Sequence, residues 1–237
     1  MMISLLKNEF YKIKISKIIF TYIIYIISLI IINKYSKSNI LDMSYNLIPF
    51  VGIVLIILFS GIICEEINSG NMRYYLTKPF KRYKIYSAKI LVILIYLIIS
   101  YLIIITTSSI IYGSIEYKYF FKFFIHMIPI IFISSLVLYL STTYKNHVLV
   151  SCISILLLTF SLTISQILFG IKINIVEYTF LPYLDFSIFN DRLLINQMNK
   201  ELMIHLSINR GIIIDLLSSI ILFALGLNKF KKKDIKN

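Results

Sequence analysis

Residues Glu65 to Lys89 read EEINSGNMRYYLTKPFKRYKIYSAK and interrupt a chain that is otherwise mostly apolar. The stretch begins with two acids, continues through a glycine, and then carries six basic residues around a single proline. Long apolar runs flank it on both sides. A run of about 20 residues crosses the roughly 30 Å hydrocarbon core of a bilayer as a helix. The pattern therefore predicts a polar loop between two membrane spans.

The composition indicates the same class of protein. The chain has 237 residues, of which 59% are hydrophobic and 15% are charged, and its mean hydropathy is +0.87. A soluble domain has roughly half apolar and about a quarter charged residues. We therefore expect an all-α integral membrane protein whose single transmembrane domain covers residues 1–237.

The apolar runs predict six membrane-spanning helices. Their expected bounds are Ile15–Ile32, Leu47–Cys64, Ile90–Tyr112, Phe123–Thr143, Val148–Phe169 and Gly211–Leu227.

The first 14 residues predict an amphipathic helix at the membrane interface. Apolar residues recur there at helical spacing while lysines occupy the other faces, which is typical of a helix lying on a bilayer surface. The apolar positions are Ile3, Leu6, Phe10 and Ile13. The alternative is that this segment is only the start of the first span.

The distribution of basic residues predicts the orientation. The N-terminal segment, the 65–89 loop, the 144–147 turn and the C-terminal tail hold sixteen Lys and Arg, against eight in the other segments. In membrane proteins, segments on the cytoplasmic side contain more Lys and Arg than segments on the opposite side. Both termini are therefore expected in the cytoplasm, and the protein in the cell (plasma) membrane as a multi-pass protein. The net charge of +13 follows this distribution, so we expect no nucleic-acid partner.

The region 170–210 is unusual for an extracellular loop. Val176–Phe189 is apolar and contains Pro182, which indicates a re-entrant or interfacial hairpin. Asp191–Leu206 then has the pattern of an amphipathic helix. An ordinary packed extracellular loop is the alternative.

Motifs for chemistry are scarce. Neither G-x-x-x-x-G-K-[ST] nor G-x-G-x-x-G occurs, so any ATPase that drives this protein is a separate polypeptide. Cys64 and Cys152 have no disulfide or metal spacing, and we expect no cofactor and no metal. Asp215 lies about one turn inside the last span, and a local pair with Arg210 would account for it.

An intramembrane enzyme is a weaker alternative. Glu65 and Glu66 with His126 could form an acid–base site, and membrane proteases of the CAAX-processing type carry paired glutamates. Those proteases have Arg at the fourth position after the second Glu, where this chain has Gly70. The expected topology also places His126 across the bilayer from the glutamates, which argues against one site.

The 65–89 loop itself predicts two helices joined by a turn. We expect the helix of the second span to continue through Glu65 to Tyr75, with Gly70 allowing another backbone to approach. Pro79 disfavours helix at the residue before it and suits the first position of a new helix, here Phe80–Ala88. Such an element would join two spans rigidly along the inner membrane face, although an ordinary basic loop is the alternative.

This stretch resembles the permease subunits of the ABC type-2 exporter family. The matching positions are Glu66, Gly70, Leu76, Pro79, Arg82 and Lys89. The Lys7-Asn8-Glu9 opening and the Phe230–Ile235 ending are also similar to that family. The resemblance implies two permease subunits, identical or sister, each engaging one cytoplasmic ATPase. We therefore assign ATPase coupling to Glu65, Glu66, Gly70, Arg73, Leu76, Pro79, Arg82 and Lys89.

The resulting expectation is a catalytically silent permease of an ATP-driven exporter in contact with membrane lipid. The family implies a hydrophobic or amphiphilic substrate, such as a lipid-like molecule or a peptide antibiotic of the bacitracin or lantibiotic kind. The main alternative is a membrane anchor or assembly protein that transports nothing.

Overall fold

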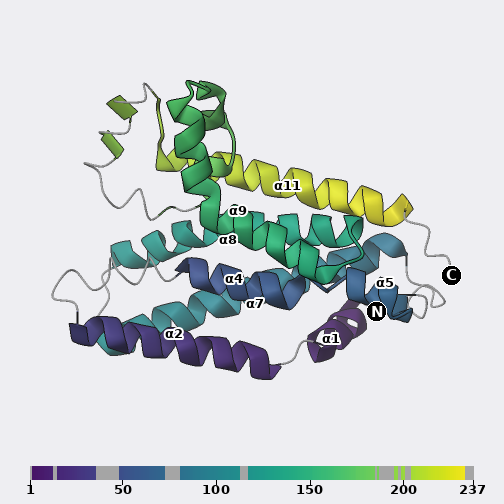
Figure 1. Cartoon of the computed structure of the whole chain (residues 1–237). Helices are drawn as coiled ribbons and strands as arrows, with labels where there is room; N and C mark the ends of the chain where they lie inside the picture. Colours follow the sequence, from purple (N-terminus) through teal and green to yellow (C-terminus); the bar gives the residue numbers. More distant parts are fainter. Residues whose placement is uncertain are drawn as a thin grey trace.

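The computed structural model describes residues 2–12, 15–35, 48–72, 81–112, 117–184, 186, 195–196, 199–200 and 204–232. Helices dominate these residues, and none of them forms a β-strand (Figure 1). The α-helices are α1 (Met2–Lys12), α2 (Ile15–Tyr35), α4 (Ile48–Phe59), α5 (Cys64–Asn68), α7 (Arg82–Tyr112), α8 (Tyr117–Thr143), α9 (His147–Gly170) and α11 (Ile208–Lys232). Two short 3-10 helices, η1 (Asn174–Tyr178) and η2 (Leu181–Tyr183), follow α9.

Within the described residues, five segments are long and apolar enough to cross a membrane. They are Val51–Asn68, Arg82–Ile110, Phe120–Thr143, His147–Gly170 and Ile208–Lys232, and they coincide with five of the six predicted spans. The remaining predicted span, Ile15–Ile32, lies within α2, a helix of 21 residues. The protein is therefore a helical, multi-pass membrane protein, while the crossing by α2 stays a prediction.

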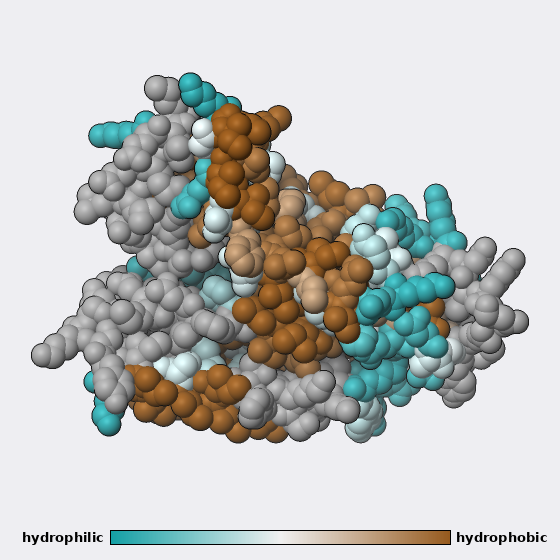
Figure 2. All heavy atoms as spheres, in the orientation of Figure 1, coloured by the Kyte–Doolittle hydropathy of each residue, from teal (hydrophilic) through white to brown (hydrophobic). Residues whose placement is uncertain are grey.

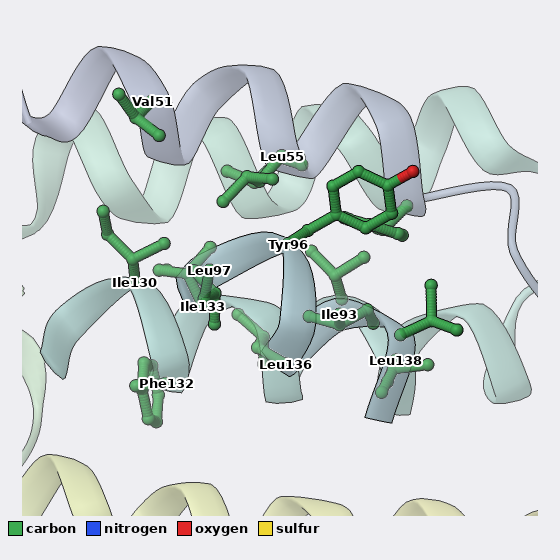
Figure 3. Close-up of a cluster of buried hydrophobic side chains, with 14 of the residues drawn as sticks. Val51, Leu55, Ile93, Tyr96, Leu97, Ile130, Phe132, Ile133, Leu136 and Leu138 are labelled. Carbon is green, nitrogen blue, oxygen red and sulfur yellow. The ribbon is translucent and has the colours of Figure 1, made fainter. Parts of the chain in front are cut away.

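Helix α8 forms the centre of the bundle. It packs against α4, α7, α9 and α11, and most of its span is buried, whereas most of α9 and α11 is exposed. Figure 3 shows side chains of α4, α7 and α8 converging on one apolar core. Val51, Leu55, Tyr96, Ile130 and Ile133 are among its buried members. This packing fixes the relative positions of the three middle helices.

Helix α9 has the reverse of the amphipathic pattern found in soluble proteins. Its buried face carries Ser154, Ser161 and Ser165, while Phe160 and Ile167 are exposed. Small residues allow close helix contact, and large apolar residues facing outward suit a lipid solvent. Figure 2 shows an apolar surface across the middle of the molecule, with the largest group of hydrophilic atoms at one end.

The second span does not continue as one helix into the following loop. Helix α4 ends at Phe59, and after a turn the short α5 begins at Cys64. Ser141 of α8 accepts hydrogen bonds from the backbone N–H groups of Ile63 and Cys64, at 3.2 and 3.1 Å. These N–H groups begin a helix and need such a partner.

The predicted continuous helix from Glu65 is therefore wrong, and its expected end at Tyr75 lies outside the described residues. Helix α5 ends at Asn68, and Gly70 has a φ of +75°. Glycine commonly terminates helices in this left-handed conformation because it has no Cβ to clash. Among the described residues of this chain, a Cβ at Gly70 would meet no atom within 4 Å, so the predicted close approach of another backbone stays a prediction.

The described part of the region after α9 is a packed loop. Val176, Tyr183, Phe186 and Ile204 join Phe169 in a second buried apolar cluster at the end of the bundle. Residues 204–207 are not helical, so the predicted helix Asp191–Leu206 does not reach its expected end. Insertion of this loop into the membrane, and its extracellular side, stay predictions.

Candidate functional site

Four charged side chains meet at one end of the bundle and form a closed ring. Lys89 Nζ of α7 lies 2.9 Å from Glu9 Oε2 of α1 and 2.7 Å from Glu66 Oε2 of α5. Lys12 Nζ of α1 lies 2.9 Å from Glu9 Oε1 and also pairs with Glu66 Oε1. Lysines and glutamates alternate, so these four residues, the ion ring, carry no net charge when all are ionised.

Most of the ion ring is buried. Lys89 is 0% exposed, Glu9 3% and Glu66 8%, whereas Lys12 lies at the surface. An ammonium group has three protons to donate. Lys89 directs its third contact to the carbonyl oxygen of Ile62, at 2.8 Å. Because burial of a charge is costly unless it is paired, the hydrogen bonds to Glu9 and Ile62 and the ion pair with Glu66 make the burial of Lys89 tolerable.

The ring also controls the ionisation of Glu9. Burial alone would raise the pKa of this carboxyl, but the Lys89 and Lys12 ammonium groups beside it have the larger combined effect. The pKa of Glu9 is therefore held below its usual range, and the carboxylate is ionised at neutral pH.

The sequence of α1 explains how Glu9 reaches this position. Leu5 and Glu9 are four residues apart and both are buried, so they share the face that packs on α7. Phe10 extends this contact, with its ring centroid 5.5 Å from that of Tyr96. The predicted amphipathic helix thus exists, and it buries an acid within its apolar face. Its contact with the membrane interface stays a prediction.

Helix α5 is also tied to the turn between α8 and α9. Asn68 Nδ2 donates to the Lys145 carbonyl oxygen at 2.7 Å, and Glu65 Oε1 lies 3.5 Å from His147 Nδ1. Glu65 and His147 are both largely exposed, so their pair is weak. Helix α5 is consequently held on both sides, by the ion ring and by this turn.

The start of α7 contacts the C-terminal end of α11. Arg82 donates from a guanidinium nitrogen to the Lys231 carbonyl oxygen at 2.8 Å. The rings of Tyr86 and Phe230 lie 5.7 Å apart. Helix α1, α5, the start of α7, the α8–α9 turn and the end of α11 therefore lie at the same end of the bundle (Figure 1). These are the segments that the basic-residue bias assigns to the cytoplasm, and that assignment stays a prediction.

The structure separates the sequence-predicted site residues into three groups. Glu66 and Lys89 are buried in the ion ring, so neither offers a free surface to a partner. Glu65 is exposed and Arg82 is partly exposed at the same end. Gly70 terminates α5. The remaining predicted residues, Arg73, Leu76 and Pro79, lie outside the described residues, and α7 begins at Arg82 rather than at the expected Phe80.

Sequence reasoning missed Glu9 and Lys12 as members of this site. The sequence does contain an indication of this role, because Glu9 lies four residues after Leu5 on the apolar face of α1. A buried acid at that position needs a cationic partner. Lys12 follows three residues later and is one of the two lysines that pair with Glu9.

A second ionic contact lies in the loop after α9. Glu177 Oε2 accepts the backbone N–H of His205 at 2.9 Å, and Arg210 lies 3.6 Å from Glu177 Oε1. Burial would raise the pKa of Glu177, but the hydrogen bonds from His205 and Tyr178, together with the Arg210 charge, lower it overall. The expected pairing of Arg210 with Asp215 is therefore wrong.

Glu66 and His126 do not form one acid–base site. His126 lies beside Phe186 in the second apolar cluster, with ring centroids 6.4 Å apart. Ser141, which contacts α5, is 15 residues further along α8, and a helix rises about 22 Å over that length. Within the described residues, no group of three or more His, Cys, Asp or Glu could hold a metal ion.

Comparison with known proteins gives a family over nearly the whole chain. The family model described as "Protein of unknown function (DUF2705)" matches residues 2–236. No curated protein matches the chain. This helical membrane protein therefore belongs to the DUF2705 family.

Proposed function

We propose that the chain is the permease subunit of an ATP-driven exporter in the cell membrane. A separate cytoplasmic ABC ATPase supplies the energy, and a second copy or a sister subunit completes the pathway. The observation that carries the proposal is the ion ring. It joins the N-terminal helix, the loop after α4 and the start of α7 into one unit at one end of the bundle.

Such a unit can transmit force between a partner and the spans. A displacement of α5 pulls on Lys89 through Glu66 and on α1 through Lys12, since separating either pair takes one of its two partners from the buried Glu66. The apolar contact between α4, α7 and α8 then carries the displacement into the membrane. The buried Glu66 and Lys89 transmit the displacement between helices. Exposed residues such as Glu65 and Lys81 make the contact with the ATPase.

The composition of the spans supports the substrate class. Outside the ion ring, the described spans hold few ionisable residues, and their outer faces are apolar. This favours a hydrophobic or amphiphilic substrate, such as a lipid-like molecule or a peptide antibiotic, over a small ion.

The test is co-purification with the ABC ATPase encoded nearest to this chain's own gene. Tagged wild-type protein is expected to retain the ATPase in detergent and to lower sensitivity to exported peptides in cells. Charge reversal by Glu65→Lys together with Lys81→Glu should reduce ATPase recovery at least tenfold. Lys172→Glu, an exposed reversal at the other end of α9, is the matched control and should leave recovery unchanged.

Other outcomes identify the alternatives. If wild-type protein retains no ATPase and deletion of the chain does not alter efflux, the protein is a non-transporting anchor or assembly factor. If Glu66→Gln abolishes cleavage of a membrane peptide while Lys89→Met does not, the intramembrane enzyme is supported instead.

A further inference from the structure

Asp215 is a buried acid that the ion ring and the loop cluster do not use. It lies on α11 with 0% exposure, and neither of its carboxyl oxygens has a hydrogen-bond partner among the described residues. Gly211 and Ser219, four residues before and after it, are buried on the same face. An intramembrane acid without a partner is rare, because each ionised group in hydrocarbon is costly.

The position of Asp215 along the bundle follows from two contacts between α8 and α11. Lys229 Nζ donates to Thr143 Oγ1 at 3.2 Å, and a Cβ at Gly226 would lie 3.5 Å from Tyr139 Cα. The two helices therefore run in the same direction. Counting back along both places Asp215 about level with Pro129, in the first half of the α11 span Ile208–Lys232.

Pro129 changes the chemistry of α8 at this level. It has no N–H, so the carbonyl oxygen of Ile125 lacks its usual helical donor. Pro129 itself therefore adds no hydrogen-bond donor at this level. A neutral carboxylic acid suits such surroundings better than a carboxylate, because the described residues give neither carboxyl oxygen of Asp215 a hydrogen-bond donor.

Among the described residues, the ionisable groups on the surrounding elements do not compensate a negative charge on Asp215. On α11 itself, Arg210 binds Glu177 and the His205 carbonyl oxygen. On α8, His126 contacts the Lys122 carbonyl oxygen at one end of the helix and Tyr139 lies near the other end. On η2, the Tyr183 hydroxyl donates to the Glu177 carbonyl oxygen, and on α7, Tyr86 lies at the level of Gly226.

A bound cation does not fit this site either. Alkali and alkaline-earth ions are held by several oxygen ligands, and the acceptors found here are the Asp215 carboxyl and at most nearby backbone or hydroxyl oxygens. Asp215 is also completely enclosed, which leaves a proton as the ligand small enough to bind.

We propose that Asp215 is a proton-binding site within the membrane. Its carboxyl is held as the neutral acid on the buried face of α11. The site is separate from the ion ring, so the proposal stands whether or not an ATPase binds the other elements.

Infrared spectroscopy tests the proposal on full-length protein reconstituted in liposomes at about pH 7. The wild type is expected to show the carbonyl stretch of a protonated carboxylic acid, shifted to lower frequency by ¹³C labelling of aspartate side chains. Asp215→Asn should lose this band completely. Glu177→Gln, which removes an acid paired with Arg210, is the control and should retain it.

Two results would overturn the proposal. One is the absence of a ¹³C-sensitive protonated-acid band from the wild type, which would mean that Asp215 is ionised. The other is persistence of that band in Asp215→Asn. If Asp215→Asn fails to fold, Asp215→Glu provides the second variant. In that variant the protonated-acid band should no longer shift with ¹³C-labelled aspartate and should shift with ¹³C-labelled glutamate instead. A band that stays with the aspartate label would equally refute the assignment.

Discussion

Lys89 is a buried cation whose charge is balanced by two carboxylates from different helices. Lys89→Met leaves Glu9 and Glu66 with Lys12 alone, so we expect a loss of about 3–5 kcal/mol of stability. The midpoint of thermal unfolding in detergent measures this loss. Lys84→Met, on the same helix but partly exposed, should change stability by less than about 0.5 kcal/mol. Equal effects of the two substitutions would contradict the structural role of the ring.

Gly70 provides a second test on a single residue. Its φ of +75° is strained for any residue with a Cβ, so Gly70→Ala should cost about 1–2 kcal/mol even though no neighbouring atom would clash. The matched control is Gly170→Ala, since Gly170 ends α9, has no clash and has an ordinary φ. That control should be neutral or gain up to about 1 kcal/mol in thermal unfolding. A loss confined to Gly170→Ala would show that the Gly70 argument is wrong.

These residues show how far the sequence allows prediction of a site. Glu66, Gly70 and Lys89 could be selected because they stand out in an apolar chain. Their roles could not be derived, because burial of Lys89 depends on Glu9, a residue 80 positions away. Charge patterning identifies which segments face water, but the pairing of charges depends on tertiary packing.

Helix α1 should detach from the bundle in acid. The lowered pKa of Glu9 means that its ionisation stabilises the folded state above about pH 4.5, its ordinary value, and that this contribution is lost as pH falls through the lower folded value. A spin label at exposed Tyr11, introduced as Tyr11→Cys in a Cys152→Ser background, should become mobile over this range. Glu9→Gln is the control, and its label should be mobile already at neutral pH. An acid-insensitive label in the wild type would refute the prediction.

The helices differ in how well the sequence predicts them. The spans α7, α8, α9 and α11 are long and predominantly apolar runs, so their length decides the assignment. In the sequence, no proline marks the break between α4 and α5. Instead Ser141, 77 residues further on, supplies the acceptor that lets Cys64 begin a new helix. Such a partner is visible only once the helices are assembled.

The orientation of the whole molecule can be tested with cysteines added one at a time to a Cys152→Ser background, in which the remaining Cys64 is buried. A membrane-impermeant maleimide applied to intact cells should label Tyr178→Cys but neither Tyr11→Cys nor Lys232→Cys. The last two positions lie at the same end of the bundle, so they should respond alike. Labelling of Tyr11→Cys and Lys232→Cys with protection of Tyr178→Cys would invert the predicted topology. Disruption of the cells must expose all three, which controls for unreactive sites.

The ion ring also has a consequence for biosynthesis. As the chain leaves the ribosome, Lys12 is available to Glu9 at once because both belong to α1. Lys89 is synthesised only after α2, α4 and α5, and it alone joins Glu9 to Glu66 through a fully buried ammonium. The N-terminal helix therefore cannot make its contacts with Lys89 until the segments between them have been synthesised. Translation of residue 89 is the earliest point at which the growing chain contains all four residues of the ion ring.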